Sequence, residues 1–210
     1  MKRILFLSAV AAVALLGTSC APSGGPIYPM TIGSVWNMSS YTLYGTTLAS
    51  LDTMSTGTRT NTALEKANLS NGREVVKFKN DATVYYKALD TTVTTTSYSY
   101  TAEVGDTIFS YTSLDDTIGT PVMRSNPAVG QTWSEGSATA MVVGQEDVTV
   151  AAGTYKKAWK VKIITNVGGV TVEMVNWYAR GVGNVKMYYE GEYQGYGQVF
   201  NEELTSAVIK

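Results

Sequence analysis

The chain has 210 residues, of which 44% are hydrophobic and 16% are charged, and its formal net charge at pH 7 is −1. This composition is typical of one globular domain with its own core, and it excludes an intrinsically disordered chain. Neutralising phosphates requires clustered Lys and Arg, which the sequence lacks, so we expect no nucleic-acid partner.

The first residues have the pattern of an export signal. Lys2 and Arg3 form a positive start, and residues 4–16 form an apolar stretch that is too short to span a bilayer as a mature helix. We therefore expect residues 1–19 to be a signal peptide that is removed from the mature protein.

Cys20, which is the sole cysteine of the chain, follows this apolar stretch. The box Leu16-Gly17-Thr18-Ser19-Cys20 resembles that of bacterial lipoproteins, although Gly17 stands where an aliphatic residue is usual. Because Gly17 and Ser19 are small, cleavage by an ordinary signal peptidase without lipidation is the alternative. A lone thiol has no internal partner in an oxidising compartment, and diacylation would consume it. We therefore expect Cys20 to be a lipid anchor.

The residues after Cys20 are small, polar or helix-breaking. We expect residues 20–28 to be a flexible tether and residues 29–210 to form a single domain. By analogy with lipoprotein sorting, Ala21 favours the outer membrane. The expected location is thus the bacterial cell envelope, with the membrane as a partner through the N-terminal lipid.

The rest of the chain reads as a series of strands, because short runs rich in Thr, Val, Tyr and Ile alternate with turn residues and no helical period is found. Residues 94–104 alternate clearly. We expect one face of that strand to lie in the core and the other to be wet. The expected core face holds Tyr98, Tyr100, Ala102 and Val104, and the wet face holds Ser97, Ser99, Thr101 and Glu103.

Turn residues divide the series. Asn71-Gly72 predicts one turn, and residues 166–169 predict the turn of a hairpin. Residues 191–197 are expected to form a longer glycine-rich loop before a last strand over 204–209. About ten strands in succession favour a single strongly curved antiparallel meander, either a half-barrel or a barrel, with a two-sheet sandwich as the alternative.

A short pattern, Gly-x-x-Trp, occurs twice, at Gly33–Trp36 and Gly130–Trp133. Each copy follows a proline and an apolar residue. We expect each to be a turn that leads into a strand whose early Trp enters the core.

Three stretches resemble the landmarks of TapB-like domains. They are residues 28–36 (YPMTIGSVW), 148–161 (VTVAAGTYKKAWKV) and 177–186 (WYARGVGNVK), with Ala151 and Tyr155 departing from the family pattern of Pro and Phe. The resemblance implies an all-β envelope domain, often on lipoproteins, with a shape related to the half-barrels of lipoprotein carriers. It implies no reaction, and it assigns no catalytic residue.

The chain has no histidine, so the commonest general base and metal ligand are missing. Because Cys20 is expected to serve as the anchor, the kinds of catalysis that remain would use a carboxylate, a Tyr or a Lys. The carboxylate candidates are Asp106, Glu135, Glu173 and Glu190, and their spacing selects no pair of the kind that a glycosidase needs. Asp115-Asp116 lacks the alternating acids of a calcium loop. We expect no metal and no cofactor.

Four tyrosines, Tyr188, Tyr189, Tyr193 and Tyr196, surround the glycine-rich residues 191–197 and form a candidate interaction surface. The favoured function is a non-catalytic binding or assembly module for an apolar small ligand or an envelope protein. A carboxylate-dependent hydrolase of envelope glycans and a purely structural lipoprotein are the alternatives. An apolar lining would favour binding, two facing acids would favour hydrolysis, and a filled interior would favour the structural role.

Overall fold

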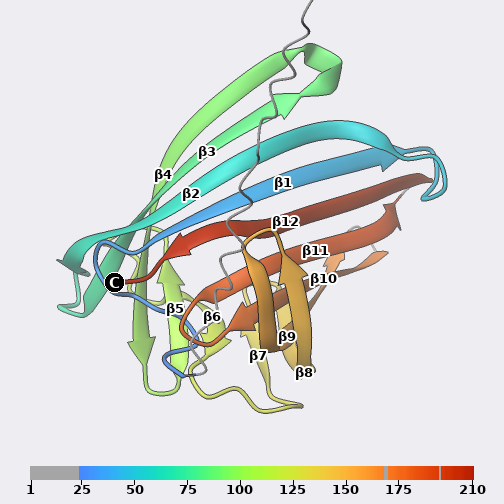
Figure 1. The fold of residues 1–210 in the computed structure, drawn as a ribbon. Helices are drawn as coiled ribbons and strands as arrows, with labels where there is room; N and C mark the ends of the chain where they lie inside the picture. The colour runs from blue at the N-terminus through green and yellow to red at the C-terminus, as the bar shows by residue number, and fades with distance from the viewer. Residues whose placement is uncertain (1–23, 168–169, 194) are drawn as a thin grey trace, which may run out of the picture.

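Twelve antiparallel strands form one sheet in the computed structural model, which describes residues 24–167, 170–193 and 195–210 (Figure 1). The strand order is β6-β5-β4-β3-β2-β1-β12-β11-β10-β9-β8-β7. The predicted single curved meander is therefore confirmed, and the two-sheet sandwich is wrong. The predicted signal peptide over residues 1–19, the predicted lipid anchor Cys20 and residues 168–169 of the predicted turn lie outside the described residues.

The strands follow one another along the chain, with a short 3-10 turn, η1 (Lys87–Leu89), between β3 and β4. No helix in the described part of the chain is long and apolar enough to cross a membrane. The strands are β1 (Val35–Gly45), β2 (Asp52–Asn68), β3 (Glu74–Tyr86), β4 (Thr91–Val104), β5 (Thr107–Tyr111), β6 (Thr120–Arg124), β7 (Thr132–Glu135), β8 (Ala138–Val150), β9 (Gly153–Val167), β10 (Val170–Ala179), β11 (Gly183–Tyr193) and β12 (Tyr196–Val208).

The first and last strands pair with each other, from Val35 opposite Val208 to Gly45 opposite Gly197. This pairing places the two edges of the sheet at β6 and β7, which are consecutive in the chain. The sheet is thus a nearly closed barrel. We call the end where β1 begins and β10 turns into β11 the closed end, and the end with the β1–β2, β3–β4 and β11–β12 turns the open end. β1 to β4 and β12 extend as a long curved sheet toward the open end (Figure 1).

The core lies at the closed end. One cluster joins Trp36 and Met38 of β1 to Phe78 of β3, and a second joins Trp133 of β7 to Val161 of β9. Ile27, only 1% exposed, packs into the second cluster, so the chain is already part of the domain before β1 begins. Both tryptophans of the Gly-x-x-Trp pattern, Trp36 and Trp133, are 7% exposed, which confirms that each enters the core early in its strand.

The alternation predicted for β4 is partly wrong. Tyr100, Ala102 and Val104 pack in a small cluster with Tyr111, but Tyr98 is 48% exposed. Thr101, expected on the wet face, is 3% exposed because that face points into the barrel. Strand curvature explains the difference, since near the closed end both faces of β4 are covered and near the open end neither is.

The turn predictions have mixed outcomes. β2 and β3 flank the predicted turn Asn71-Gly72, and β9 and β10 pair from Val167 opposite Val170, so the predicted turn and the predicted hairpin are both found. The prediction of a long glycine-rich loop over residues 191–197 is wrong, because β11 runs to Tyr193 and β12 begins at Tyr196. The last strand therefore begins eight residues before the predicted start at residue 204.

Candidate functional site

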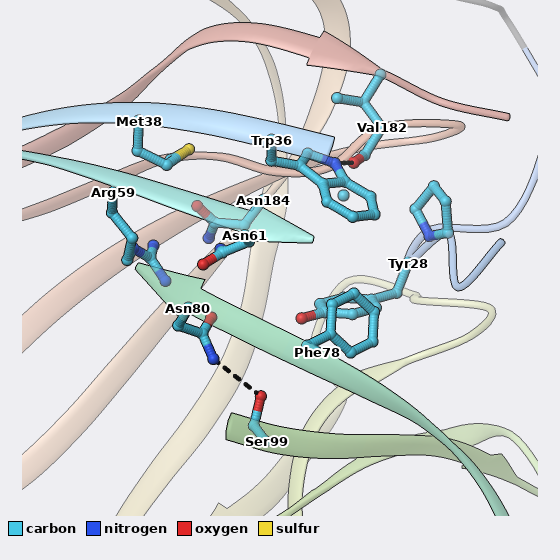
Figure 2. A pocket seen from close by; sticks show the side chains of 12 residues that line it. Tyr28, Trp36, Met38, Arg59, Asn61, Phe78, Asn80, Ser99, Val182 and Asn184 are labelled. Carbon is cyan, nitrogen blue, oxygen red and sulfur yellow. Dashed lines mark hydrogen bonds between the residues drawn. The ribbon is translucent and has the colours of Figure 1, made fainter. Parts of the chain in front are cut away.

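A cavity of about 160 Å³ lies inside the barrel near the closed end (Figure 2). Ligand pockets for drug-sized molecules are usually about 300–1,000 Å³, whereas one water needs about 10–15 Å³, so this cavity suits several waters or one small group. Its lining comprises Tyr28, Pro29, Trp36, Met38, Arg59, Asn61, Phe78, Asn80, Ser99, Val182, Gly183 and Asn184.

The cavity has an aromatic side. Trp36 and Phe78 lie with ring centroids 5.9 Å apart, and Tyr28 meets Phe78 edge-on at 6.4 Å. The Trp36 indole N–H donates a hydrogen bond to the carbonyl oxygen of Val182 at 2.6 Å, which fixes the ring against the β10–β11 turn. This side offers apolar ring surface to whatever occupies the cavity.

The opposite side of the cavity is polar. Arg59 of β2, Asn61 of β2 and Asn80 of β3 project from neighbouring strands, and Asn184 of β11 lies beside Asn61 (Figure 2). Trp36 faces Asn61 in the β1–β2 register, and Asn61 faces Asn80 in the β2–β3 register. Facing residues of antiparallel strands point to one side of the sheet, so register alone brings these side chains together.

Arg59 is held by an ion pair with Glu202 of β12. The Arg59 Nε–H donates a hydrogen bond to Glu202 Oε1 at 3.0 Å, and the Arg59 Nη2–H donates a second one to Glu202 Oε2. The ion pair is therefore bidentate. The Glu202 side chain is 9% exposed and that of Arg59 is 32% exposed. The pair spans β1, which lies between the two strands, and it orients the guanidinium at the cavity wall.

Two of the wall amides have a free acceptor. Asn80 Nδ2 donates to Ser99 Oγ at 3.3 Å. The buried Oδ1 atoms of Asn61 and Asn184 have no hydrogen-bond partner among the described residues. An unpaired buried acceptor costs about 1–3 kcal/mol, so a donor in the cavity would be stabilised at this place.

A second polar group lies behind this wall. The Tyr178 hydroxyl is hydrogen-bonded by Asn184 and Asn176, and its pKa is raised first by burial and then by the charge of Glu135. Burial also raises the pKa of Glu135 to about 7, and its Oε2 atom has no hydrogen-bond partner among the described residues. Glu135 is thus the predicted acid with the most perturbed environment.

The other predicted acids have separate partners. Asp106 pairs with Arg124, Glu173 pairs with Lys162, and Glu190 accepts a hydrogen bond from the Tyr188 hydroxyl. Asp116 accepts backbone N–H groups of Thr112, Ile118 and Gly119, which hold the pKa of its carboxyl below the ordinary value. None of these acids is among the residues that line the cavity.

The predicted tyrosines Tyr188 and Tyr189 lie on opposite faces of the sheet. Tyr189 faces Phe200 and points inward, whereas Tyr188 faces Asn201 and points outward. Tyr196 stacks on Tyr44 with ring centroids 5.3 Å apart at the open end. Tyr193 faces Tyr196 at the end of the β11–β12 hairpin. The Tyr188 pKa is raised to about 12, mainly by its hydrogen bond to Glu190.

The cavity residues Arg59, Asn61, Asn80 and Asn184 were not among the candidates from the sequence. Their separation along the chain hides them, because Asn184 reaches Asn61 only when β1 pairs with β12 and the sheet curls. One local signal was available: Arg59 and Asn61 interrupt a run of Thr and Ser with period two, which places both on one face of the strand.

The three stretches that carry the TapB-like resemblance meet at the closed end. Trp36, Tyr155, Trp177 and Val182 belong to one core cluster, and the Ala152 N–H donates to the Leu204 carbonyl at 3.0 Å. These landmark residues therefore pack together in the core at the closed end, and some residues of the first and third stretches, among them Trp36 and Asn184, also line the cavity.

No model of a known protein family matches the chain, and no curated protein matches it. Two solved structures are similar. One is a suggested lipoprotein from Parabacteroides distasonis, with a TM-score of 0.44 and 14% identity over 88% of this chain and 99% of that chain. The other is a suggested exported protein with a YmcC-like fold from Bacteroides fragilis, with a TM-score of 0.42 and 12% identity over 88% of this chain and 99% of that chain. Likeness at this level carries no argument about function.

Proposed function

We propose that this chain is a lipid-anchored protein of the bacterial cell envelope whose β-domain binds a small hydroxyl-bearing molecule, such as one sugar ring, in its cavity. The observation that carries the binding proposal is the pair of unpaired buried acceptors, Asn61 Oδ1 and Asn184 Oδ1, in the cavity wall. Hydroxyl groups donate to amide oxygens, and the guanidinium of Arg59 supplies donors to hydroxyl oxygens.

The aromatic side of the cavity completes this chemistry. A sugar ring has apolar C–H faces and polar edges, which match Trp36 and Phe78 on one side and the amides on the other. The polar wall favours such a ligand over the purely apolar one expected from the sequence. The size of the cavity, about 160 Å³, limits the bound part to one small ring or to the end of a longer molecule.

The anchor proposal rests on the sequence. Cys20 would follow the signal peptide, and a short tether would reach Ile27, which is buried in the domain. Gly181 N–H donates to the Pro26 carbonyl, so the tether would join the domain at the closed end. Membership of the TapB-like family and an outer-membrane location belong to the same proposal.

Replacement of Asn61 tests the binding proposal. Asn61→Leu removes the acceptor and keeps the branched shape of the side chain, so we expect about tenfold weaker binding of N-acetylglucosamine or glucose in titration calorimetry, because one hydrogen bond contributes about 1.4 kcal/mol. Thr58→Ala, an exposed change on the outer face of the same strand, is the control. No binding of either sugar by the wild type, together with no small molecule released from the protein as purified, would refute the proposal.

A hydrolase is the second candidate, and the raised pKa of Glu135 is the observation that favours it. A protonated carboxyl near neutral pH can act as a general acid. If hydrolysis of envelope glycans is detected, Glu135→Gln should abolish it and Glu173→Gln, which removes an outer-face acid, should not. Equal activity of the two variants would remove this candidate.

A further inference from the structure

The long strand β4 has one free edge. Residues 91–99 pair with β3 from Tyr86 to Phe78, while β5 begins its pairing with β4 only at Tyr100. Residues 91–98 are all exposed. Figure 1 shows β4 along the outer margin of the long sheet near the open end. Within the described chain, every second residue over this nine-residue stretch therefore presents an unpaired backbone N–H and C=O on the free side.

This edge lacks the usual protections against strand pairing. Natural edges are kept short, or carry Lys, Pro or a bulge. Residues 91–99, TTVTTTSYS, contain no charge and no proline, and their register with β3 has no bulge. The two terminal strands of the sheet differ, because β6 has five residues including Pro121 and β7 has four residues. The long free edge of β4 thus lacks these protections.

We propose that β4 pairs antiparallel with β4 of a second copy of this chain, about a two-fold axis at Thr95. Thr95 is the midpoint of the free stretch, so Thr94 then faces Thr96 of the second copy and Val93 faces Ser97. Every facing pair is uncharged, and Thr–Thr pairs across antiparallel strands are favourable. A two-fold axis brings the same surface of both copies together, so the interface is complementary to itself. Because pairing then occupies the free edge of β4 in both copies, assembly stops at a dimer.

Side-chain contacts already prepare β4 for this pairing. Thr94 Oγ1 lies 3.2 Å from Thr83 Oγ1, and Thr96 Oγ1 donates to Asp81 at 2.6 Å, so both hydroxyls are oriented on the outer face. These contacts help to hold β4 against β3. Little further ordering is needed when the second copy binds.

Crosslinking tests the register. In the full mature chain with Cys20→Ala, Thr95→Cys should form a disulfide dimer on mild oxidation, because facing Cα atoms lie about 4.5–5.5 Å apart in antiparallel pairs. Thr58→Cys is the control, since it is exposed but lies on β2, which has neighbours on both sides. Equal crosslinking of the two variants would overturn the proposal.

Charge changes test the interface without cysteine. Sedimentation velocity at about 100 µM should show a dimer for the wild-type chain with Cys20→Ala. The variant Thr94→Lys/Thr96→Lys places like charges opposite each other and should be monomeric, whereas Thr94→Lys/Thr96→Glu places opposite charges there and should remain a dimer. A monomeric wild type, or a dimer that survives the double lysine change, would contradict this pairing.

Discussion

Trp36 and Val182 lie 146 residues apart in the sequence, and the indole N–H of Trp36 donates to the Val182 carbonyl at 2.6 Å. This bond ties the first strand to the β10–β11 turn and forms the base of the cavity. It joins two of the stretches that resemble TapB-like domains, and it shows that those residues stabilise the closed end.

Loss of this bond should destabilise the domain. Trp36→Phe keeps a ring but leaves the Val182 carbonyl unpaired, so we expect the free energy of unfolding to fall by about 1–3 kcal/mol. Trp133→Phe is a matched control, because Trp133 is also 7% exposed but its indole N–H has no hydrogen-bond partner among the described residues. Urea unfolding should show a smaller loss for the control, and equal losses would contradict the assigned role of the bond.

The Arg59–Glu202 pair should respond asymmetrically to mutation. Arg59→Met leaves a buried carboxylate without its cation, and we expect a loss of about 2–3 kcal/mol. Glu202→Leu leaves a guanidinium that is 32% exposed, so water compensates and the loss should be about 1 kcal/mol. The double variant should recover part of the first loss. Urea unfolding of the three variants checks the order, and a larger loss for Glu202→Leu would disagree with it.

The raised pKa of Glu135 predicts that the stability of the domain depends on pH. Its folded pKa of about 7 lies above the ordinary value of 4.5, so between these values the folded state binds more protons than the unfolded state. The free energy of unfolding should therefore be higher at pH 5 and fall as the pH rises through 7. After allowance for partial exposure, we expect a change on the order of 1–2 kcal/mol.

Glu135→Gln isolates this effect, because the amide does not titrate. The slope of stability between pH 5 and pH 8 should be smaller in the variant than in the wild type when both are measured by urea unfolding. An unchanged slope would show that the carboxyl of Glu135 is not the titrating group.

Gly119 should be sensitive to substitution. Its φ is +68°, and an added Cβ would lie 2.5 Å from Cε1 of Tyr111, which is fully buried and whose hydroxyl accepts a hydrogen bond from Arg73 at 2.7 Å. We expect Gly119→Ala to cost about 2–4 kcal/mol, from backbone strain and steric overlap together.

Gly72 provides the control for that change. Its φ is +84°, but a Cβ there would meet nothing within 4 Å, so Gly72→Ala should cost only about 1 kcal/mol of strain. Thermal unfolding midpoints should follow this order. If the two alanine variants melt at the same temperature, contact with Tyr111 adds nothing to the cost.

Period-two patterns predicted much of the sheet, because alternation is a local property. The predicted turn at Asn71-Gly72, the predicted hairpin and the early tryptophans Trp36 and Trp133 follow from residues within a few positions of one another. The pairing of β1 with β12 could not be predicted in this way, since it depends on how far the meander curls. The same curl decides that Thr101 is buried and Tyr98 is exposed.

The candidate site was harder to predict for the same reason. Asn61, Asn80 and Asn184 carry no charge and match no motif, and a single Asn is usually a solvated or turn residue. A site is indicated only because the fold brings the three asparagines to one cavity and because the Oδ1 atoms of Asn61 and Asn184 have no hydrogen-bond partner among the described residues. Glu135 was identified as a candidate from the sequence, but its raised pKa depends on burial that the sequence does not show.

The proposed binding function depends most on the cavity and its unpaired acceptors. The most direct measurement is mass spectrometry of small molecules released from the full mature protein after gentle purification, with wild type and Asn61→Leu compared. We predict a hydroxyl-bearing molecule in stoichiometric amount from the wild type and much less from Asn61→Leu, which should be at least as stable to urea because it buries no unpaired oxygen. Release of the same molecule in equal amounts from both proteins would contradict the proposed site.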